Sequence, residues 1–325
     1  MITVYLTHGQ SNRDITELLT SWTWSGDKAS ISRQLSGEIV FLDTDDLPVP
    51  ELGDRITMVD GLDQIFSGTV LRREVNSEAS TMDFTAFDDG YDLGRNDGTY
   101  KFTGATPEAI TRQICADQDI SVAELPVTLA ALNRKFAAVP LKDILTTVWT
   151  LASERTGYNY ALRYTPDGLL VKVRSESDRS IVIQARSNLM DATTKEDATQ
   201  MVNRVAIYDK NGNFLRRLGD EDAQALYGVM EKHVTESDDA GEADNAARKA
   251  LDDGRLAQNI TVNLLGDLRL ITGETVLVRD AKTGLNGIFW VDADQHTWKN
   301  KNYYCKLTLN VRNVMNKATA GQEVS

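Results

Sequence analysis

The first hundred positions of the chain alternate between apolar and polar residues. Ile2, Val4 and Leu6 stand two apart at its start, and a period of two is typical of a strand with one buried face. Asp60-Gly61 separates two further apolar runs and predicts a β-hairpin, because glycine accepts the positive φ of a tight turn. This region is therefore predicted to form a small antiparallel barrel or sandwich.

Beyond this region the apolar period changes to that of a helix. Pro107 suits the first turn of one helix, in which Ile110 and Ile114 share a face. A clearer helix follows Pro140 and ends at Gly157, a residue suited to a left-handed C-terminal cap. Its apolar stripe consists of Leu141, Ile144, Leu145, Val148, Leu151 and Ala152. Such a stripe predicts burial against a sheet.

Strand patterns return after the second helix. Residues 158–164 and 169–174 are joined by Pro166-Asp167-Gly168, so they predict a hairpin that completes a compact α+β unit. Residues 203–208 run into Asn211-Gly212, a second hairpin signal. Further strands are predicted at residues 181–183, 261–264, 275–279, 287–291 and 306–311.

An acidic helical stretch interrupts these later strands. Asp220 can cap a short helix that ends near Gly228. Residues 242–258 place alanines at helical spacing and predict a second, longer helix. The stretch therefore predicts an insertion within the strands around it.

The fold class predicted by these patterns is α+β and predominantly β, with two β-barrel domains and an α+β unit between them. The predicted first barrel covers residues 1–104, the α+β unit 105–178 and the second barrel 179–314. A helical insertion is expected at about 218–258 in the second barrel. Residues 315–325 lack an apolar pattern and are predicted to be a flexible tail.

The charge of the chain argues against binding to nucleic acid. Its 48 acidic and 35 basic residues give a formal charge of −13, whereas affinity for a phosphate backbone rests on clustered Lys and Arg. An acidic surface also suits a passage through which DNA slides without sticking, although it equally serves ordinary solubility. The sequence has no run of about 18 apolar residues and no signal peptide at its start, so we expect synthesis in the cytoplasm and no membrane insertion.

The residues that most often carry chemistry are scattered. Cys115 and Cys305 are far apart, as are His8, His233 and His296, so their spacing supports no disulfide framework, zinc site or catalytic triad. Both cysteines are expected to be buried as small apolar residues. We therefore predict no cofactor, no metal and no catalytic residue.

Trp22, Trp24 and Asp27 are the candidate structural or interface residues. Trp22 and Trp24 stand two apart on a predicted strand, so they share a face and can form an aromatic patch for a partner. Packing in the core is the stronger interpretation, because large aromatic side chains dominate cores as well as interfaces. Gly26-Asp27 is predicted to be a turn.

Two acidic runs invite a metal-binding interpretation. Residues 43–46 begin like a calcium loop, but Pro48 occupies the position that needs glycine and Asp54 the position that needs glutamate. Residues 236–239 lie close to Glu242 and Asp244 and form a cation site, a docking patch or, most simply, a solvated loop.

A series of short motifs gives the chain an individual signature. They are Trp22-Thr23-Trp24-Ser25-Gly26-Asp27, Arg33-Gln34-Leu35, Gly53-Asp54, Phe66-Ser67-Gly68, Tyr100-Lys101-Phe102, Pro107-Glu108-Ala109-Ile110, Met201-Val202-Asn203-Arg204-Val205, Thr283-Gly284-Leu285 and Val291-Asp292-Ala293-Asp294-Gln295-His296. In this order, and over nearly the whole chain, they resemble the XkdQ/YqbQ hub proteins of PBSX-like prophages and related tailed phages. Each motif alone is weak, and the order makes the resemblance specific.

The resemblance implies a structural baseplate hub of a contractile phage tail or tail-like particle. Such a hub is a homotrimer with two tube-type barrels per chain, so that six barrels form a pseudo-hexameric ring. The ring joins the tail tube protein to the central spike protein and anchors other baseplate proteins. Three copies would carry three times −13, or −39, and an acidic lumen would repel passing DNA.

Two other classes of protein stay open at this point. A peptidoglycan-degrading tail hydrolase would need two carboxylates in contrasting environments, and no segment of lysozyme size is left after the domains are assigned. A fibre or baseplate adaptor would not need to match a six-fold ring.

Overall fold

The computed structural model describes residues 2–42, 47–175, 181–236 and 240–324. The chain folds into two compact units, of which the first comprises Met1–Ala192 with Thr261–Ser325 and the second Thr193–Ile260. The run at residues 43–46, considered above as a calcium loop, lies outside the described residues.

The first β half of unit 1 is an antiparallel set of strands. Hydrogen bonds join β1 to β2 and β5, β5 to β6, β6 to β7, and β7 through β4 to β3. The turn between β5 and β6 has Gly61 at φ +62°, so the predicted hairpin is confirmed. The strands are β1 (Ile2–His8), β2 (Ser11–Asp14), β3 (Leu19–Asp27), β4 (Gln34–Val40), β5 (Arg55–Asp60), β6 (Asp63–Val75) and β7 (Thr81–Phe87), with the 3-10 helix η1 (Thr16–Leu18) between β2 and β3.

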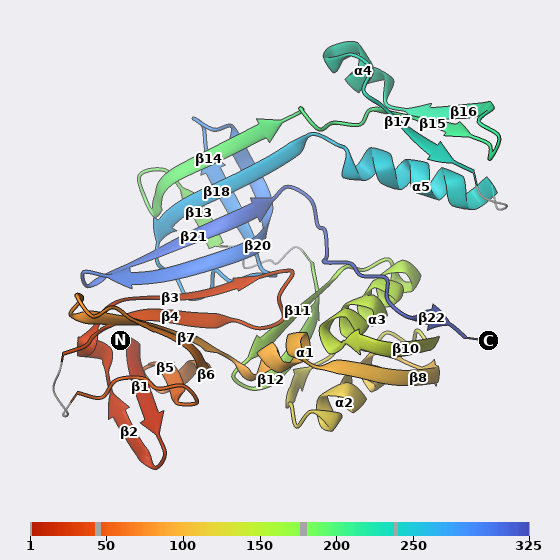
Figure 1. The fold of residues 1–325 in the computed structure, drawn as a ribbon. Helices are drawn as coiled ribbons and strands as arrows, with labels where there is room; N and C mark the ends of the chain where they lie inside the picture. The colour runs from red at the N-terminus through yellow and green to blue at the C-terminus, as the bar shows by residue number, and fades with distance from the viewer. Residues whose placement is uncertain (1, 43–46, 176–180, 237–239, 325) are drawn as a thin grey trace. The chain divides into compact units, whose positions relative to one another are not determined.

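The second β half follows later in the chain and joins the first. Strand β20 pairs with β3 over seven consecutive positions, from Ala293 opposite Asp27 to Lys299 opposite Ser21, so both halves belong to one 13-stranded sheet (Figure 1). The strands of this half are β13 (Ile181–Gln184), β14 (Leu189–Asp197), β18 (Ala257–Leu265), β19 (Thr275–Asp280), β20 (Leu285–Lys299) and β21 (Asn302–Asn310).

The predominantly β, α+β class predicted from the sequence is confirmed. Two separate closed barrels are not seen among the described strands, because the hydrogen-bonded order runs from β14 to β2 without returning on itself and β3 is used to reach the second half. The sequence shows which residues form strands, whereas partners more than 250 residues apart are set by tertiary packing.

A row of aromatic residues crosses the joint between the halves. Tyr303, Trp298, Trp22, Gly37 and Phe84 are successive register partners on β21, β20, β3, β4 and β7. The Trp22 and Trp298 rings stack with centroids 5.5 Å apart, and those of Trp298 and Tyr303 with centroids 4.4 Å apart. The row belongs to the main core of the sheet.

The α+β part of unit 1 has its own core. Pro107 opens α2 behind the N-cap Thr106, and Gly157 ends α3 at φ +75°, so both predicted helices and their end signals are confirmed. The elements are η2 (Asp89–Tyr91), α1 (Asp92–Arg95), β8 (Asp97–Ala105), α2 (Pro107–Asp117), β9 (Val122–Glu124), β10 (Leu132–Pro140), α3 (Leu141–Thr156), β11 (Tyr160–Thr165) and β12 (Gly168–Val173). Ile110, Ile114, Leu141 and Ile144 are among its fully buried residues.

The end of the described chain packs onto this α+β part. Residues 313–324, called the tail segment below, include the buried Met315 and the short strand β22 (Gln322–Glu323), which pairs with β10. The tail predicted to be flexible is thus placed against α3 and β10. Its contacts are mainly made by backbone groups, which explains why the apolar pattern of the sequence does not indicate them.

Unit 2 is a three-stranded sheet with a helix packed on it. The strand order is β16-β15-β17, and Val205 and Ile207 pack against Ala243 and Ala247 of the helix. Its elements are β15 (Arg204–Tyr208), β16 (Phe214–Gly219), α4 (Glu221–Tyr227), β17 (Glu231–Thr235) and α5 (Ala240–Asp253). The predicted hairpin at Asn211-Gly212 is confirmed.

The helices of unit 2 follow the predicted signals with one difference. Asp220 caps α4 by accepting a hydrogen bond from the Ala223 amide, and the helix ends before Gly228. The longer helix was expected through residue 258, but α5 ends at Asp253. Gly254 follows directly, and β18 already starts at Ala257, so the helix stops at the glycine and its last expected residues belong to the sheet.

Candidate functional site: a buried charge network

Strand β3 places the two candidate tryptophans on its inner face. Trp24 is buried, with the Arg33 guanidinium 3.8 Å from its ring centroid, whereas Trp22 is partly buried and stacks on Trp298. Trp24 is therefore buried in the core, whereas Trp22 is partly buried and packs against that core. A role of Trp22 or Trp24 in contacting a partner stays a prediction.

The predicted turn at Gly26-Asp27 is wrong, because both residues belong to β3. A Cβ at Gly26 would collide with the Arg33 side chain, so the glycine makes room for that arginine. Asp27 is exposed at the strand end, where its carboxylate accepts a hydrogen bond from the Ala29 amide at 2.7 Å. The structure brings Trp22 and Trp24 together and leaves Asp27 apart from them.

The inner face of β20 carries a buried carboxylate that neutralises Arg33. Asp294 accepts both guanidinium branches of Arg33, and its Oδ1 also accepts the Thr272 amide and hydroxyl, each at 2.7 Å. Its Oδ2 lies 3.3 Å from Nε2 of His296. Burial by itself raises the pKa of Asp294, but the positive charge of Arg33 and the hydrogen bond from His296 hold that pKa well below its usual range.

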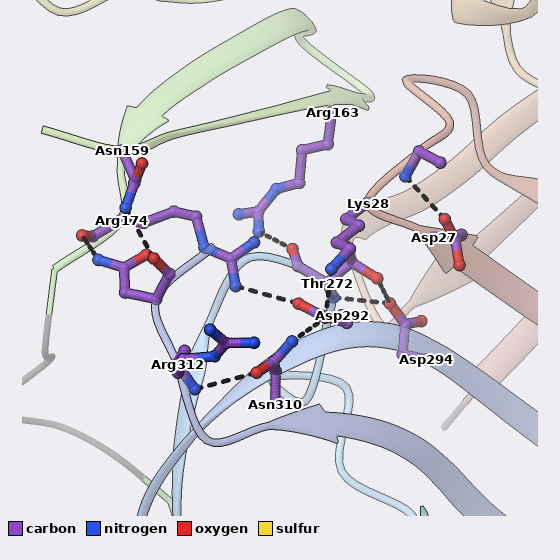
Figure 2. A network of polar contacts seen from close by, with 12 residues as sticks. Asp27, Lys28, Asn159, Arg163, Arg174, Thr272, Asp292, Asp294, Asn310 and Arg312 are labelled. Carbon is purple, nitrogen blue, oxygen red and sulfur yellow. Dashed lines mark hydrogen bonds and ion pairs between the residues drawn. The ribbon is translucent and has the colours of Figure 1, made fainter. Parts of the chain in front are cut away.

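Two residues earlier on β20, Asp292 collects a second set of donors. Lys28 Nζ lies 2.5 Å, Asn310 Nδ2 3.1 Å and Arg174 Nη2 3.3 Å from its carboxylate oxygens, as Figure 2 shows. Arg174 is buried just after β12, and burial lowers the pKa of its guanidinium. Asp292 therefore ties the sheet to the α+β part.

A third cluster of ion pairs forms around Glu274, in the loop before β19. Glu274 accepts hydrogen bonds from Arg163 Nη1 at 2.9 Å and from Lys172 Nζ at 2.7 Å, and Arg163 also donates to the Thr272 carbonyl at 2.9 Å. Burial raises the pKa of Glu274, whereas Lys172 and Arg163 lower it, and the net shift is downward. These contacts attach hairpin β11–β12 to the loop before β19.

Asp88 is a buried carboxyl whose pKa is raised, in contrast to those of Asp294 and Glu274. Its two oxygens accept hydrogen bonds from the Arg33 and Gly90 amides, at 2.8 and 3.1 Å. Burial raises its pKa to about 7, although the Arg33 hydrogen bond opposes the shift. Asp88 joins the end of β7 to the start of the α+β part.

The chemistry of the network is that of a structural clamp. Each of Asp292, Asp294 and Glu274 is engaged by at least one cation, so none stands ready as a general base. Cys115 and Cys305 are buried as predicted, and burial raises the thiol pKa of both, that of Cys115 to about 12. In the described part of the chain no three His, Cys, Asp or Glu residues are arranged to hold a metal ion.

The acidic run in unit 2 also proves to be partly paired. Glu236 and Asp244 lie 2.6 and 2.7 Å from the Arg216 guanidinium. Residues 237–239 of that run lie outside the described residues.

The main residues of the network lie within the signature motifs of the sequence, but the motifs do not by themselves indicate what these residues do. Arg33, Asp292, Asp294 and His296 all occur in the quoted strings. A signal was available, since Asp292, Asp294, His296 and Trp298 stand two apart on one strand and so share a face. Charged residues in register with a buried tryptophan indicate buried ion pairs.

Comparison with known proteins places this fold among phage tail and baseplate proteins. A 43 kDa tail protein of prophage MuSo2 from Shewanella oneidensis superposes with a TM-score of 0.72 at 13% identity, covering 95% of this chain and 98% of that protein. A tail protein from Neisseria meningitidis gives a TM-score of 0.63 at 16% identity over 95% and 96% of the two chains. A component of the type VI secretion system of E. coli gives 0.53 at 10% identity over 94% and 76%.

The sequence comparisons identify the family. The chain belongs to the YQBQ-like family, whose model matches residues 22–310. It is 23% identical over 264 residues to phage-like element PBSX protein XkdQ of Bacillus subtilis, covering 78% of this chain and 79% of that protein. It is 22% identical over 245 residues to YqbQ of the same organism, covering 73% and 74%.

Proposed function

We propose that this structural tail protein is the central hub of a contractile-tail baseplate, acting as a homotrimer that joins the tail tube to the central spike. The observation that carries the proposal is the agreement of the fold with a prophage tail protein over 95% of this chain and 98% of the other. The family match over residues 22–310 supports the same role.

The division of unit 1 into two β halves supports a trimer that adapts symmetry. Each chain contributes the strands β1–β7 and a second set joined to them through β20, so a trimer presents six β halves. A ring of that kind meets a six-fold tube on one side and a three-fold spike on the other, which resolves the mismatch between the two symmetries.

The partners follow from this placement. The tube protein contacts one face of the ring, the spike protein the other, and further baseplate proteins its periphery. A PdpA–VgrG complex from Francisella is also similar in fold, with a TM-score of 0.56 at 9% identity over 100% of this chain and 60% of that chain. We propose synthesis in the bacterial cytoplasm and assembly into a virion or tail-like particle; none of the described helices is long and apolar enough to cross a membrane.

We further propose that the protein has no hydrolase activity. The buried acids Asp292, Asp294 and Glu274 hold cations in place, and both oxygens of Asp88 accept backbone hydrogen bonds. A zymogram on peptidoglycan with the purified protein is expected to show no clearing. Clearing by the wild type that persists in repeated preparations would favour the tail hydrolase instead.

The central experiment is the mass of the purified protein in solution. Light scattering alone and after mixing with the neighbouring spike and tube proteins is expected to give three copies of the chain, either at once or on mixing. A chain that stays monomeric with both partners would overturn the hub and favour a fibre or baseplate adaptor. Electron microscopy of the assembled ring then tests the six-fold arrangement directly.

The charge of the ring offers a second test. Three copies carry three times −13, or −39, and we propose that part of this charge lines the lumen so that DNA passes without binding. A map of the assembled trimer is expected to show an acidic lumen. A neutral or basic lumen would contradict this part of the proposal.

A further inference from the structure

Lys28, Asp292 and Asn310 come from three neighbouring strands at one end of the joint between the β halves. Lys28 directly follows β3, Asp292 lies in β20 and Asn310 ends β21, and β20 runs between the other two strands. The Lys28 amide donates to the Asp292 carbonyl at 2.8 Å, which continues the pairing of β3 with β20 and fixes the lysine beside the carboxylate. Residues that are far apart in the sequence are thus neighbours in the sheet.

A β-bulge in β20 falls at Asp292. The register against β21 shifts between Val291 and Ala293, so Asp292 has no register partner on β21. An extra residue of this kind commonly re-aims a side chain next to a functional site. Here Oδ2 of Asp292 lies 2.5 Å from Lys28 Nζ and 3.1 Å from Asn310 Nδ2. One carboxylate oxygen therefore contacts the amine that follows β3 and the side-chain amide at the end of β21.

The side-chain amide of Asn310 is also polarised at its oxygen. Its Oδ1 accepts a hydrogen bond from the Arg312 amide at 3.0 Å, as Figure 2 shows. A donor at this position stabilises the negative charge that develops on a carbonyl oxygen when a nucleophile attacks the carbon. The other oxygen of Asp292 contacts Arg174 Nη2 at 3.3 Å, which holds the carboxylate in place. The cluster thus contains an amine, a proton acceptor and a polarised amide carbon.

We propose that Lys28 and Asn310 form an isopeptide bond, in which Nζ of the lysine is joined to the side-chain carbonyl carbon of the asparagine and ammonia is released. A lysine amine acts as a nucleophile when a neighbouring group takes up its proton, and Asp292 lies within reach of Nζ for that transfer. Asp292 is not free to act as a base on a bound substrate, because cations engage it. Here the engaging cation is itself the nucleophile.

The reaction balances without an oxidant or a cofactor. The Lys28 ammonium gives a proton to the Asp292 carboxylate, and the free amine attacks Cγ of Asn310. The Asp292 carboxyl then protonates Nδ2, the Cγ–Nδ2 bond breaks as ammonia leaves, and the carbonyl double bond forms again. The surplus proton on Nζ passes through Asp292 to the ammonia, which departs as ammonium. Asp292 ends as a carboxylate, and the Lys28 side chain, which is 29% exposed, gives the ammonium an exit to solvent.

The bond would lock the joint between the two β halves. It would tie the end of β3 to the end of β21 across β20 and close a covalent ring through residues 28–310. A cross-link over a long loop restricts the unfolded chain, and it persists when the strands separate. Because the tail segment begins three residues after Asn310, the bond would also fix the point at which that segment leaves the sheet. The inference does not depend on the number of copies in the hub.

Peptide mapping of the purified wild type, kept for a day at neutral pH, tests the bond. Trypsin does not cleave after an acylated lysine, so we expect a branched peptide in which residues 14–33 are joined to residues 307–312. The intact chain should be lighter than its sequence by one molecule of ammonia and should migrate faster on a denaturing gel. The branched peptide decides, because a succinimide at Asn211-Gly212 or Asn286-Gly287 would also release ammonia.

Three variants separate the roles. Lys28→Arg keeps a cation beside Asp292 but removes the nucleophile, so the branched peptide should disappear. Asp292→Asn should slow its formation about a hundredfold or more, the usual contribution of general acid–base catalysis. Lys249→Arg is the matched control, because Lys249 Nζ also lies 2.5 Å from a carboxylate oxygen, that of Asp253, and its loss should leave the branched peptide at the wild-type level. Circular dichroism checks that each variant is folded.

The wild type alone can overturn the proposal. If its residues 14–28 and 307–312 are recovered only as separate peptides, the bond does not form. A branched peptide on residues 307–312 that persists in Lys28→Arg would also contradict the proposal, since another group would then be the nucleophile. Formation at the wild-type rate in Asp292→Asn would reject Asp292 as the proton carrier.

Discussion

Asp292 and Asp294 project from one face of β20 into the interior, and each is neutralised by cations from distant segments of the chain. Removing a carboxylate from water costs several kcal/mol, which attraction to a partner repays only when the geometry is good and the remaining lone pairs are also used. Thr272, Asn310 and His296 complete that hydrogen bonding. The network therefore contributes mainly to the unique placement of the α+β part on the sheet.

Loss of one carboxylate should be costly at this site. We expect Asp294→Asn to lower the free energy of unfolding by about 3–5 kcal/mol, because it leaves the buried Arg33 guanidinium without a counter-charge. Urea unfolding followed by circular dichroism measures the change. Glu74→Gln is the control, since the Arg72–Glu74 pair is exposed and should contribute about 0–1 kcal/mol. Equal effects of the two substitutions would show that the network is not a clamp.

The two kinds of buried carboxyl predict opposite dependences on pH. The pKa of Asp88 is raised to about 7 in the fold, so the native state binds its proton more tightly, and this contribution to stability declines as the pH rises from about 4 to 7. The slope should reach about 1 kcal/mol per pH unit and disappear in Asp88→Asn. Unfolding curves at several pH values measure it, and identical slopes in both proteins would contradict the prediction.

Asp294 should act in the other direction. Its pKa is lowered in the fold, so its contribution is present above the ordinary aspartate pKa and is lost as the pH falls below about 4. We expect the wild type to lose stability there more steeply than Asp294→Asn does. Acid titration of both proteins measures the difference. Parallel titration curves would show that Asp294 is not held ionised.

The individual residues of the site were only partly predictable from the sequence. Trp24 lies on the inward-facing side of an alternating strand pattern, so its burial is predictable from the sequence. Arg33 can lie over that ring because Gly26 has no side chain to collide with it. Gly26 has this position because β3 continues through Gly26-Asp27, where a turn was expected. Pairing across more than 250 residues, as between Arg33 and Asp294, cannot be read from local periodicity.

At the scale of the elements, the aromatic row across β21, β20, β3, β4 and β7 depends on one small residue. Gly37 lies between Trp22 and Phe84 in register, and a Cβ there would lie 2.7 Å from the fully buried Phe84 ring. The strands can adopt this register because glycine leaves room for the Phe84 ring.

Gly37→Ala is therefore expected to destabilise the protein by about 1–3 kcal/mol, the range for overpacking a dense core. Thermal unfolding followed by near-ultraviolet circular dichroism reports both stability and the aromatic packing. Gly94→Ala is the control, because Gly94 lies in α1 with open space around it and alanine favours helices. A neutral Gly37→Ala would show that the row tolerates repacking.

The elements themselves were largely predictable where local chemistry determines them. The Asp60-Gly61 and Asn211-Gly212 turns and the cap at Gly157 all require backbone shapes that glycine adopts. The end of α5 was not predicted, although Gly254 directly follows its last residue, Asp253, and glycine is a usual stop signal for a helix. The hairpin signal at Asn211-Gly212 implies β16, whereas β17 was not predicted, because it lies between two helical signals.

At the scale of the whole molecule, unit 2 is a module with its own core. Unit 1 continues on both sides of it, and Asp191 and Asn263 at the two junctions are hydrogen-bonded at 3.0 Å. The ends that unit 2 connects are thus adjacent. The insertion was predicted from its helices, whereas its separate sheet and core were not.

Replacement of residues 198–256, which lie between β14 and β18, by a short Gly-Ser linker should therefore leave unit 1 folded. We expect its melting temperature to change by only a few degrees, because the buried clusters of unit 1 lie outside the replaced residues and short loops close cheaply. Calorimetry measures this. The same linker replacing β18–β21, which removes core strands, should prevent folding and serves as the control.

The joint between β3 and β20 also has a mechanical meaning. Seven consecutive residue pairs hold the two β halves edge to edge, and a pull along the strands loads the hydrogen bonds of those pairs together, whereas a pull across the strands opens them one after another. A hub that bears the recoil of a contracting sheath gains from the first orientation. The direction in which neighbouring proteins pull on each half would then decide whether these hydrogen bonds are loaded together and resist contraction of the sheath, or break one after another.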